Sequence, residues 1–541
     1  MGLCGHKSSV HDPYKLSDTS SQSSPRSPPP PRSSGGGNVP VHDGMHSSDT
    51  EFSEGGRRRP SQVSVTGMAT ETAKRRMRLI TETWGNINDL YGMDSGKLGE
   101  GSFGYVCKAT SRETGVVRAV KVMSKSRTRD TRKRYRQEAA IMKLTDHPNI
   151  IKLFETFEDK QNLHLVLELC MGGDLHTRLQ SMRHFPEHDA VELMKQVLRP
   201  VFYLHDKHLC HRDLKPENFL FLTPPGPINE SLLKLADFGF ARLVKRGQAM
   251  TTKLGTPRYS SPQVLAGQYG ESCDVWSCGV IMFVLLSGMQ PFDGKSDAEV
   301  MQRVRRGNYA FKGATWDAIS DGAKDTIRSM LTYKEEDRAT AEQVLQRMSP
   351  RNAAGDPGAQ LNLTPNLLLN LQHFCSQSLF RRAALQVVAQ HLRAEDSAYL
   401  RNAFMSLDSR GAGSISIREL RDQISYWGIT ASRPDLAQAM EDLHIEGDAE
   451  ISFTDFLAAT LSPQHYTQEG ACSAAFRAFD RRGQNRITIS DLWAVLYDSD
   501  GNEEQYRHAQ ELLDSVDTNR DGAIDFVEFR QMLAGETPVV H

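Results

Sequence analysis

The sequence has few of the features that mark secreted, membrane or nucleic-acid-binding proteins. Its eight cysteines are scattered, so we expect reduced thiols and neither a disulfide framework nor a zinc site. The longest apolar run, Val280 to Leu286, is far shorter than the ~18 residues that a membrane span needs. The start of the chain lacks the apolar core of a secretory signal. The net charge of −2 creates no general attraction to nucleic acid. We therefore expect a cytoplasmic protein with no nucleic-acid partner.

The length of 541 residues is too great for one hydrophobic core and suggests three or four units. Residues 1–75 are rich in Ser, Pro and Gly, and they offer too few apolar side chains to offset chain entropy, so we expect disorder. In residues 91–349, short β-like runs precede longer helical stretches, which predicts a small sheet lobe followed by a helical lobe. The fold class expected there is α+β and bilobal.

The N-terminus begins MGLCGHKSS, which places Gly2 and Cys4 close together. A myristoyl group on Gly2 and a palmitoyl group on Cys4 would form a two-signal membrane anchor. The usual pattern has Ser or Thr where this chain has His6, so an unmodified N-terminus is the alternative. We therefore expect a cytoplasmic protein, with membrane association if both groups are attached.

A glycine-rich loop of the GxGxxGxV type spans residues 99–106 and follows a predicted strand. Glycines let backbone N–H groups approach phosphate oxygens, although the same pattern also occurs in ordinary turns. Lys121 lies further on, in the apolar strand around AVK, and a buried lysine needs an anionic partner. Nucleotide phosphates and Glu138, on the next predicted helix, would supply that partner.

The segment HRDLKPEN, residues 211–218, contains the groups that phosphoryl transfer requires. Asp213 would accept the proton of the substrate hydroxyl, Lys215 would neutralise the transferred phosphate, and Asn218 would reach a magnesium ion. The DFG segment follows a predicted strand, and its Asp237 would supply the second magnesium ligand. The four motifs in this order indicate an ATP- and Mg²⁺-dependent phosphotransferase.

Residues 91–349 resemble eukaryotic protein kinases of the calcium/calmodulin type, with DHPNII, ELCMGGDL, GTPRYSSPQVL, DVWSCGV and DRATAEQVL as landmarks. With the C-terminal repeats, the chain is similar to calcium-dependent protein kinases. The resemblance implies that Lys121 contacts the α- and β-phosphates and pairs with Glu138. It further implies that Leu167 is the gatekeeper, that Glu168 to Cys170 form the hinge that meets adenine, and that Asp274 braces the catalytic loop. The residues implied to contact the nucleotide are Leu98, Gly99, Gly101, Gly104, Val106, Lys121, Glu168 and Cys170.

The resemblance also suggests the substrates, which would be proteins with Arg three residues before the target Ser or Thr. Asp174 falls where related kinases place an acid for that arginine, and Glu217 adds charge nearby. Asp174 could instead simply cap the helix that begins there, since aspartate is a common N-cap. Arg58 lies three residues before Ser61, so the N-terminal segment is a candidate autophosphorylation site.

One position departs from the family pattern. The activation segment ends in Ser-Pro-Gln263, where the family has Ala-Pro-Glu, and the missing glutamate normally pairs with an arginine, here Arg338. Losing one partner of a buried ion pair is costly, but glutamine retains an acceptor oxygen for a neutral hydrogen bond. Arg212, before the catalytic aspartate, suggests a phosphorylated activation loop with Thr251 or Thr252 as the target.

Four polar loops recur near a period of 36 residues, each with one isoleucine at an equivalent place: Ile415, Ile451, Ile487 and Ile524. This spacing predicts four helix–loop–helix units, in two pairs, over residues 396–535. The last loop has the oxygen ligands and turn glycine of a calcium site. Its expected ligands are Asp517, Asn519, Asp521, Ala523 through its carbonyl, Asp525 and Glu528.

The other three loops are degenerate. Arg410 and Arg482 stand at ligand positions of the first and third loops, and Ala449 replaces the glycine of the second. These loops retain only some acids, including Asp408, Glu419, Asp455, Asp480 and Asp491. A cation in the loop repels calcium, so we expect these units chiefly to preserve the pairing of the repeats.

Residues 363–395 are predicted to form one amphipathic junction helix, from about 365 to 393, that resembles the autoinhibitory segment of the family. Such a helix can lie in the kinase cleft or in an apolar groove that calcium opens. The resulting hypothesis is a Ser/Thr protein kinase that calcium switches on by moving this helix. The alternatives are the same kinase with little calcium dependence, or a kinase-like scaffold without catalysis, which the intact phosphotransfer residues argue against.

Overall fold

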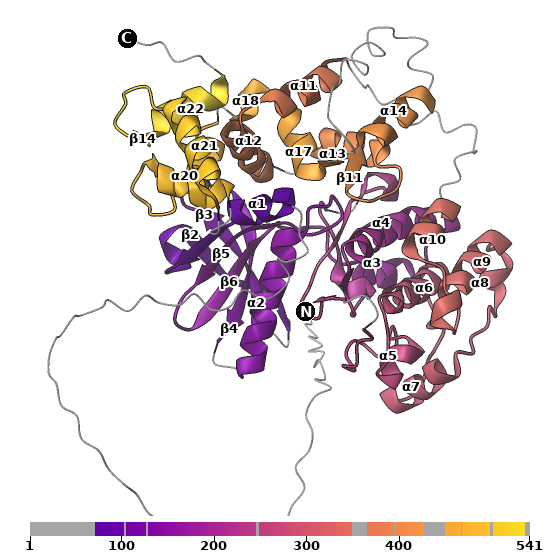
Figure 1. The fold of residues 1–541 in the computed structure, drawn as a ribbon. Helices are drawn as coiled ribbons and strands as arrows, with labels where there is room; N and C mark the ends of the chain where they lie inside the picture. Colours follow the sequence, from indigo (N-terminus) through magenta and orange to yellow (C-terminus); the bar gives the residue numbers. More distant parts are fainter. Residues whose placement is uncertain are drawn as a thin grey trace, which may run out of the picture. The chain divides into compact units, whose positions relative to one another are not determined.

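The computed structural model describes residues 71–101, 104–125, 128–224, 226–244, 248–348, 365–393, 396–426, 450–466, 468–497 and 501–535. Figure 1 shows these residues as a sheet lobe, a helical lobe and a C-terminal helical region (residues 365–535). Nearly all of the segment predicted to be disordered lies outside the described residues. No helix in the described ranges combines the length and apolarity needed to cross a membrane.

The sheet lobe contains six strands in the order β1-β5-β6-β4-β3-β2. Neighbouring strands are antiparallel except for β1 and β5, which are parallel. Helix α2 begins after Thr128, whose hydroxyl accepts a hydrogen bond from the Thr131 N–H and so caps the helix. The elements are β1 (Thr81–Trp84), β2 (Tyr91–Gly101), β3 (Gly104–Ser111), β4 (Val117–Ser124), α2 (Arg129–Leu144), β5 (Leu153–Glu158) and β6 (Asn162–Leu167).

Helix α1 (Glu71–Leu79) precedes the sheet lobe and corrects the prediction that disorder extends to residue 75. Leu79 is buried, and the Arg76 guanidinium lies 2.8 Å from the Asp146 carboxylate. The Arg78 side chain donates to the carbonyls of Val495 and Leu496 in the C-terminal helical region. These long-range contacts hold the helix in place. They could not be predicted from the polar composition of the segment.

The helical lobe is built around α6 (Ser272–Ser287), which is buried along almost its whole length. Trp276 stacks on Phe292 with ring centroids 5.5 Å apart. The other helices are α3 (Leu175–Met182), α4 (Glu187–Asp206), α5 (Pro262–Ala266), α7 (Asp297–Arg306), α8 (Ala314–Asp317), α9 (Asp321–Met330) and α10 (Ala341–Met348). The short strands are β7 (Leu209–Cys210), β8 (Phe219–Phe221), β9 (Leu233–Leu235) and β10 (Arg242–Leu243), and β7 pairs with β10 while β8 pairs with β9. Short 3₁₀ turns span Ile87–Asp89, Pro216–Asn218, Ile228–Glu230 and Glu335–Asp337.

The C-terminal helical region confirms the repeat read from the sequence. Ile415 pairs with Ile451 and Ile487 pairs with Ile524, so the four loops form two antiparallel pairs. The strands are β11 (Ser414–Ser416), β12 (Glu450–Ser452), β13 (Ile487–Thr488) and β14 (Ala523–Ile524). The flanking helices are α13 (Ala398–Leu407), α14 (Ile417–Tyr426), α17 (Phe453–Ala459), α18 (Pro463–Tyr466), α19 (Glu469–Phe479), α20 (Ile489–Leu496), α21 (Glu503–Asp514) and α22 (Phe526–Ala534).

The predicted junction helix is two helices, α11 (Pro365–Ser376) and α12 (Leu379–His391). The chain breaks at Ser378, whose hydroxyl caps α12 by accepting from the Arg381 N–H. Phe380 of α12 is fully buried, with its ring 5.0 Å from Phe479 and 5.8 Å from Phe529. Of the two places expected for this segment, α12 therefore occupies an apolar groove between helices of the C-terminal region.

Candidate active site and calcium loops

Three charged side chains from separate elements meet at the sheet lobe. The Lys121 ammonium, on β4, lies 2.7 Å from a Glu138 oxygen on α2 and 2.8 Å from an Asp237 oxygen. The expected pairing of Lys121 with Glu138 is therefore present. Burial alone would lower the pKa of Lys121, but Glu138 and Asp237 more than offset it, so the pKa is raised and the ammonium stays charged. This arrangement holds a cation ready for nucleotide phosphates.

The glycine-rich loop joins β2 to β3, and Ser102 and Phe103 at its tip lie outside the described residues. Gly104 has φ of +146°, and a Cβ there would lie 1.9 Å from the Val122 carbonyl oxygen. Only glycine fits, because the backbone passes directly against β4. Gly99 and Gly101 face open space at the position of a side chain, which leaves room for a ligand. Leu98 is exposed, while Val106 is partly buried against the core.

Asp213 is held from two sides. Its Oδ1 accepts hydrogen bonds from the N–H and the hydroxyl of Thr256, each 3.0 Å long, and its Oδ2 lies 2.9 Å from the Lys215 ammonium. Lys215 also donates to the Thr256 hydroxyl over 3.1 Å. The Asn218 amide nitrogen donates to the Asp213 carbonyl over 2.7 Å, so its side-chain oxygen is the atom that remains for a metal ion. The sequence reasoning missed Thr256, although it lies within the landmark GTPRY.

Asp274 braces the catalytic segment, as the resemblance implied. Its carboxylate accepts the backbone N–H groups of His211 and Arg212, each over 2.8 Å, and lies 3.1 Å from the His205 ring. These donors outweigh burial and lower the pKa of Asp274, so the buried group stays ionised. The Arg212 side chain donates to the Phe240 carbonyl over 2.7 Å, next to the segment that supplies Asp237.

Glu168, in the hinge, forms contacts through both its backbone and its side chain. The Glu168 N–H donates to the Lys152 carbonyl, while its carboxylate lies 2.9 Å from the Lys234 ammonium. That carboxylate is therefore committed to an ion pair, and a nucleotide would meet the hinge backbone at this position. Burial raises the pKa of the Cys170 thiol to about 12, so the thiol is neutral.

Two further predicted positions have defined partners. Gln263 accepts a hydrogen bond from the Arg338 guanidinium over 3.0 Å and donates to the Tyr333 carbonyl over 2.6 Å. The neutral hydrogen bond expected at this departure from the family pattern therefore exists. Asp174 caps α3, with one oxygen accepting from the Thr177 N–H over 2.7 Å and the other from the Thr177 hydroxyl over 3.0 Å. The capping role of Asp174 is therefore formed, and its role toward a peptide arginine stays a prediction.

The fourth loop has the backbone turn and the internal hydrogen bonds of a calcium loop. Asp517 accepts the Gly522 N–H over 2.9 Å, and Glu528 reaches back to the Thr518 N–H over 2.8 Å. Asp517 and Glu528 are both largely buried. Gly522 has φ of +82°, the turn that a calcium loop requires at its sixth position. Oxygen ligands in this pattern fit a hard cation such as calcium.

The third loop has a cation of its own. Arg482 lies 3.8 Å from Asp491, the last acid of the loop, while Asp480 accepts the N–H groups of Gln484 and Asn485. An arginine beside an acid of the loop places a positive charge where a calcium ligand would be expected.

The first loop uses its arginine differently. Asp408 accepts the N–H groups of Ala412 and Gly413, each over 2.8 Å, and burial raises its pKa to about 6. Arg410 turns to the helical lobe, where it lies 3.6 Å from Glu342. In the second loop Asp455 accepts the Ser452 hydroxyl over 2.8 Å, and the predicted positions 427–449 lie outside the described residues.

The C-terminal helical region is attached to the sheet lobe through Asp146. One carboxylate oxygen lies 2.8 Å from Arg76 of α1 and 3.1 Å from the Thr454 N–H of α17. The other oxygen accepts the Thr454 hydroxyl over 2.7 Å. Burial would raise the pKa of Asp146, but Arg76 and these donors lower it below its ordinary value. The sequence held no signal for this group, because its partners are 70 and 308 residues away.

Comparisons with known proteins agree with this geometry. A protein kinase domain matches residues 93–348, and an EF-hand domain pair matches residues 470–534. The chain is 36% identical over 454 residues to calcium-dependent protein kinase 3 of Plasmodium berghei (strain Anka), covering 83% of this chain and 81% of that protein. It is 35% identical over 454 residues to calcium-dependent protein kinase 5 of Plasmodium falciparum (isolate 3D7), covering 83% and 78%. It is 34% identical over 442 residues to calcium-dependent protein kinase 7 of Oryza sativa subsp. japonica, covering 81% and 80%.

These relatives extend the comparison beyond the separate domains, because each match covers more than four fifths of the chain. The kinase uses ATP with Mg²⁺, acts on protein substrates and responds to Ca²⁺ through its own EF-hand domain. The chain belongs to the calcium-dependent protein kinase family, as a Ser/Thr protein kinase regulated by calcium.

Proposed function

We propose specific roles for the residues of this calcium-regulated kinase. Asp213 accepts the proton of the substrate hydroxyl, and Thr256 and Lys215 fix the direction of its carboxylate. Lys121 holds the α- and β-phosphates of ATP, and Lys215 balances charge on the transferred group. The observation that carries this proposal is the formed contact of Lys121 with both Glu138 and Asp237.

Magnesium would be held by Asn218 and Asp237, where it neutralises charge on the phosphates. Oxygen donors suit this hard cation, and the Asn218 amide is oriented so that its oxygen is the available atom. Asp237 remains ionised because Lys121 outweighs burial and lowers its pKa. The two residues therefore offer one neutral and one charged oxygen to the metal ion.

The fourth calcium loop is the principal sensor in this proposal, because it alone among the described loops has its full predicted ligand set without a competing arginine. Calcium there would reorganise α22, whose N-terminus carries Glu528. Phe529, the next residue, lies against Phe380 of the junction helix α12. A short path of contacts thus joins the loop to the segment that resembles the autoinhibitory junction.

Substrate recognition is proposed to depend on an arginine three residues before the target. The Glu217 side chain is 42% exposed and lies 3.8 Å from His176, so a peptide can reach its carboxylate. Asp174 adds a second negative charge while capping α3. A peptide arginine would be drawn to both groups.

A kinase assay on an arginine-containing peptide, with calcium or with chelator, tests these roles. Asp213→Asn should abolish phosphate transfer, and Glu217→Gln should raise the KM for that peptide but not for its alanine-substituted counterpart. The matched control for Glu217→Gln is Glu230→Gln, an exposed acid of the same lobe. Equal KM changes for both peptides, or in both variants, would contradict the role of Glu217.

Acylation is a separate part of the proposal and concerns residues outside the described ranges. A myristoyl group on Gly2 and a palmitoyl group on Cys4 would attach an otherwise cytoplasmic kinase to membranes. Mass spectrometry of the N-terminal peptide from a eukaryotic host tests this directly. Detection of an unmodified Gly2 on all of the protein would refute it, and Gly2→Ala supplies the reference mass.

A further inference from the structure

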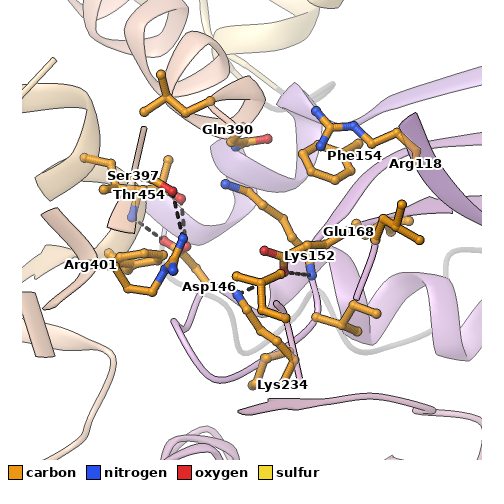
Figure 2. A pocket seen from close by; sticks show the side chains of 18 of the residues that line it. Arg118, Asp146, Lys152, Phe154, Glu168, Lys234, Gln390, Ser397, Arg401 and Thr454 are labelled. Carbon is orange, nitrogen blue, oxygen red and sulfur yellow. Dashed lines mark hydrogen bonds and ion pairs between the residues drawn. The ribbon is translucent and has the colours of Figure 1, made fainter. Parts of the chain in front are cut away.

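A cavity of about 300 Å³ lies between the back of the kinase hinge and the C-terminal helical region. One wall comes from β4, β5 and the hinge, and the opposite wall comes from α12, α13 and α17. Figure 2 shows Gln390 of α12 facing a group of charged side chains on the kinase side. The volume of the cavity is at the lower end of the range for small-molecule sites. Apart from Glu168, whose backbone is proposed to meet the nucleotide, the lining contains none of the residues assigned above to ATP, magnesium or calcium.

The lining is strongly basic. Seven lysine or arginine side chains line the cavity, against two carboxylates, those of Asp146 and Glu168. The seven are Arg76, Arg118, Lys143, Lys152, Lys234, Arg393 and Arg401. His147 adds no charge, because burial lowers its pKa to about 3. The excess of cations over anions in a partly enclosed space is therefore five.

Several of these cations are balanced by acids. Arg76 pairs with Asp146, and Lys234 pairs with Glu168, so the only two carboxylates of the lining are already engaged. Outside the lining, Glu82 lies 2.5 Å from Lys143 and Asp396 lies 2.9 Å from Arg393. These pairs account for four of the seven cations.

Arg118 and Lys152 have no such partner among the described residues. Arg118 is only 9% exposed, and its guanidinium lies flat over the Phe154 ring at 3.6 Å without an ion pair or a hydrogen bond. Lys152 is engaged only through its backbone, whose N–H donates to Glu168. Burial lowers the pKa of Lys152 to about 8, because the nearby charges of Asp146 and Glu168 offset it only in part and those of Lys234 and Arg118 add to it. Arg118 is buried and Lys152 is partly buried, and neither forms an ion pair with a carboxylate among the described residues. Cations in such surroundings favour the binding of an anion.

We propose that this cavity is a binding site for a small anion that carries a phosphate group. The flat guanidinium of Arg118 offers a fork of N–H donors along its edge, which matches two phosphate oxygens. Lys152 supplies a point charge that can turn toward the same group. Apolar side chains at the hinge end, including Leu169, Met171 and Leu222, leave space for an organic portion.

Binding at this site is linked to the position of the C-terminal region, because the two walls belong to different parts of the chain. An anion held between β4 and α12 favours the arrangement in which these walls lie together. The ligand would therefore act on regulation, and it would change the calcium concentration for half-maximal activity without entering the active site.

Isothermal titration calorimetry of the full chain tests the proposal with two probes, inorganic phosphate and phenyl phosphate. The protein is saturated with calcium, and an uncharged inhibitor fills the ATP site over both the adenine position and the Lys121 side chain, so that phosphate cannot bind there. Saturable binding of one phosphate per chain is expected. Tighter binding of phenyl phosphate identifies an organic phosphate as the ligand class, and equal affinities identify free phosphate. The absence of saturable binding by either probe overturns the proposal.

Variants locate the bound anion. Arg118→Gln and Lys152→Gln should each weaken binding at least ~10-fold, since each removes a charge-assisted contact. Lys160→Gln is the matched control, because Lys160 is an exposed lysine of the same lobe, and it should leave the affinity unchanged. Equal weakening by the control, or no weakening by either cavity variant, would place the anion elsewhere and overturn the proposal.

A stability measurement covers the case in which a variant disturbs the fold. In phosphate-free buffer Lys152→Met should raise the midpoint of thermal unfolding, because it removes an unbalanced buried charge. Phosphate should then raise the midpoint of the wild type but not that of Lys152→Met. If phosphate stabilises both proteins equally, the cavity is not the site.

Discussion

The attachment of the C-terminal region at Asp146 makes the most direct prediction. The perturbation is Asp146→Asn, which keeps the shape of the side chain but removes its charge. In the native protein this carboxylate serves Arg76 of α1 and both the N–H and the hydroxyl of Thr454 in α17. The variant should therefore loosen the contact of α17 with the kinase domain while the active site remains formed.

The magnitude follows from burial. The side chains of Arg76 and Asp146 are 10% and 6% exposed, so the substitution leaves a buried arginine without its counter-charge. Removing one partner of such a pair costs about 3–5 kcal/mol. Thr454→Val removes only the hydroxyl bond to the same carboxylate and should cost about 1.5–3 kcal/mol. In the double variant the two effects should not add, because both act through one group.

Hydrogen exchange of the full chain measures this opening. A cost of 3–5 kcal/mol corresponds to roughly 10²- to 10⁴-fold faster exchange of the amides in α17, provided that they exchange through this local opening. Asp206→Asn, at an exposed carboxylate, is the control and should leave α17 unchanged. If α17 exchanged at the same rate in wild type and Asp146→Asn, the assignment of Asp146 as the attachment would be wrong.

The same group predicts a pH dependence with a definite sign. The folded-state pKa of Asp146 lies below its ordinary value of 3.8, so the unfolded state binds the proton more readily. Its stabilising contribution is complete above that ordinary value and is lost as the pH falls through the depressed folded-state pKa. Exchange in α17 should accelerate in this acidic window for the wild type, with rates corrected for intrinsic pH effects. Asp146→Asn should lack that acceleration.

Three further predictions concern the kinase and its calcium loops. Glu528→Gln should remove most of the calcium activation in the peptide assay, whereas Asp491→Asn should leave it intact, and continued activation of the first variant would refute a fourth-loop sensor. Thr256→Val should lower kcat about 10- to 100-fold, with little change in the KM for ATP, because it removes a hydrogen bond to the catalytic carboxylate. Gln263→Ala should destabilise the kinase domain by about 1–3 kcal/mol, since it removes an acceptor from the buried Arg338, and an unchanged unfolding midpoint would contradict this.

The sequence was most informative where function depends on contiguous residues. Lys215, Asn218 and Asp213 lie within one short segment, so their motif predicted both their identities and their proximity. The loop spacing predicted the isoleucine pairs for the same reason. Thr256 was missed because its role depends on the folding of the activation segment back onto Asp213. A motif identifies the residues that perform the chemistry more readily than the residues that orient them.

Elements that depend on distant partners were predicted less well. The amphipathic pattern of residues 365–393 correctly indicated helix, but it did not show the break at Ser378, although serine is a favoured N-cap and could have signalled it. Helix α1 was missed because Arg76 and Arg78 find their partners far along the chain. Likewise the resemblance placed Glu168 at the hinge, but only the structure shows its carboxylate paired with Lys234 at the back.

The degenerate first loop illustrates how a calcium site can be kept for packing. Gly413 has φ of +70°, and a Cβ there would lie 2.8 Å from both His147 and Tyr203 of the kinase domain. Arg410, at a former ligand position, lies 3.6 Å from Glu342 of α10. The glycine required by the calcium turn is thus also required for close contact, and the arginine that repels calcium supplies a contact of its own. This loop therefore provides a contact between the first pair of repeats and the kinase domain, and the proposed sensor, the fourth loop, lies in the other pair.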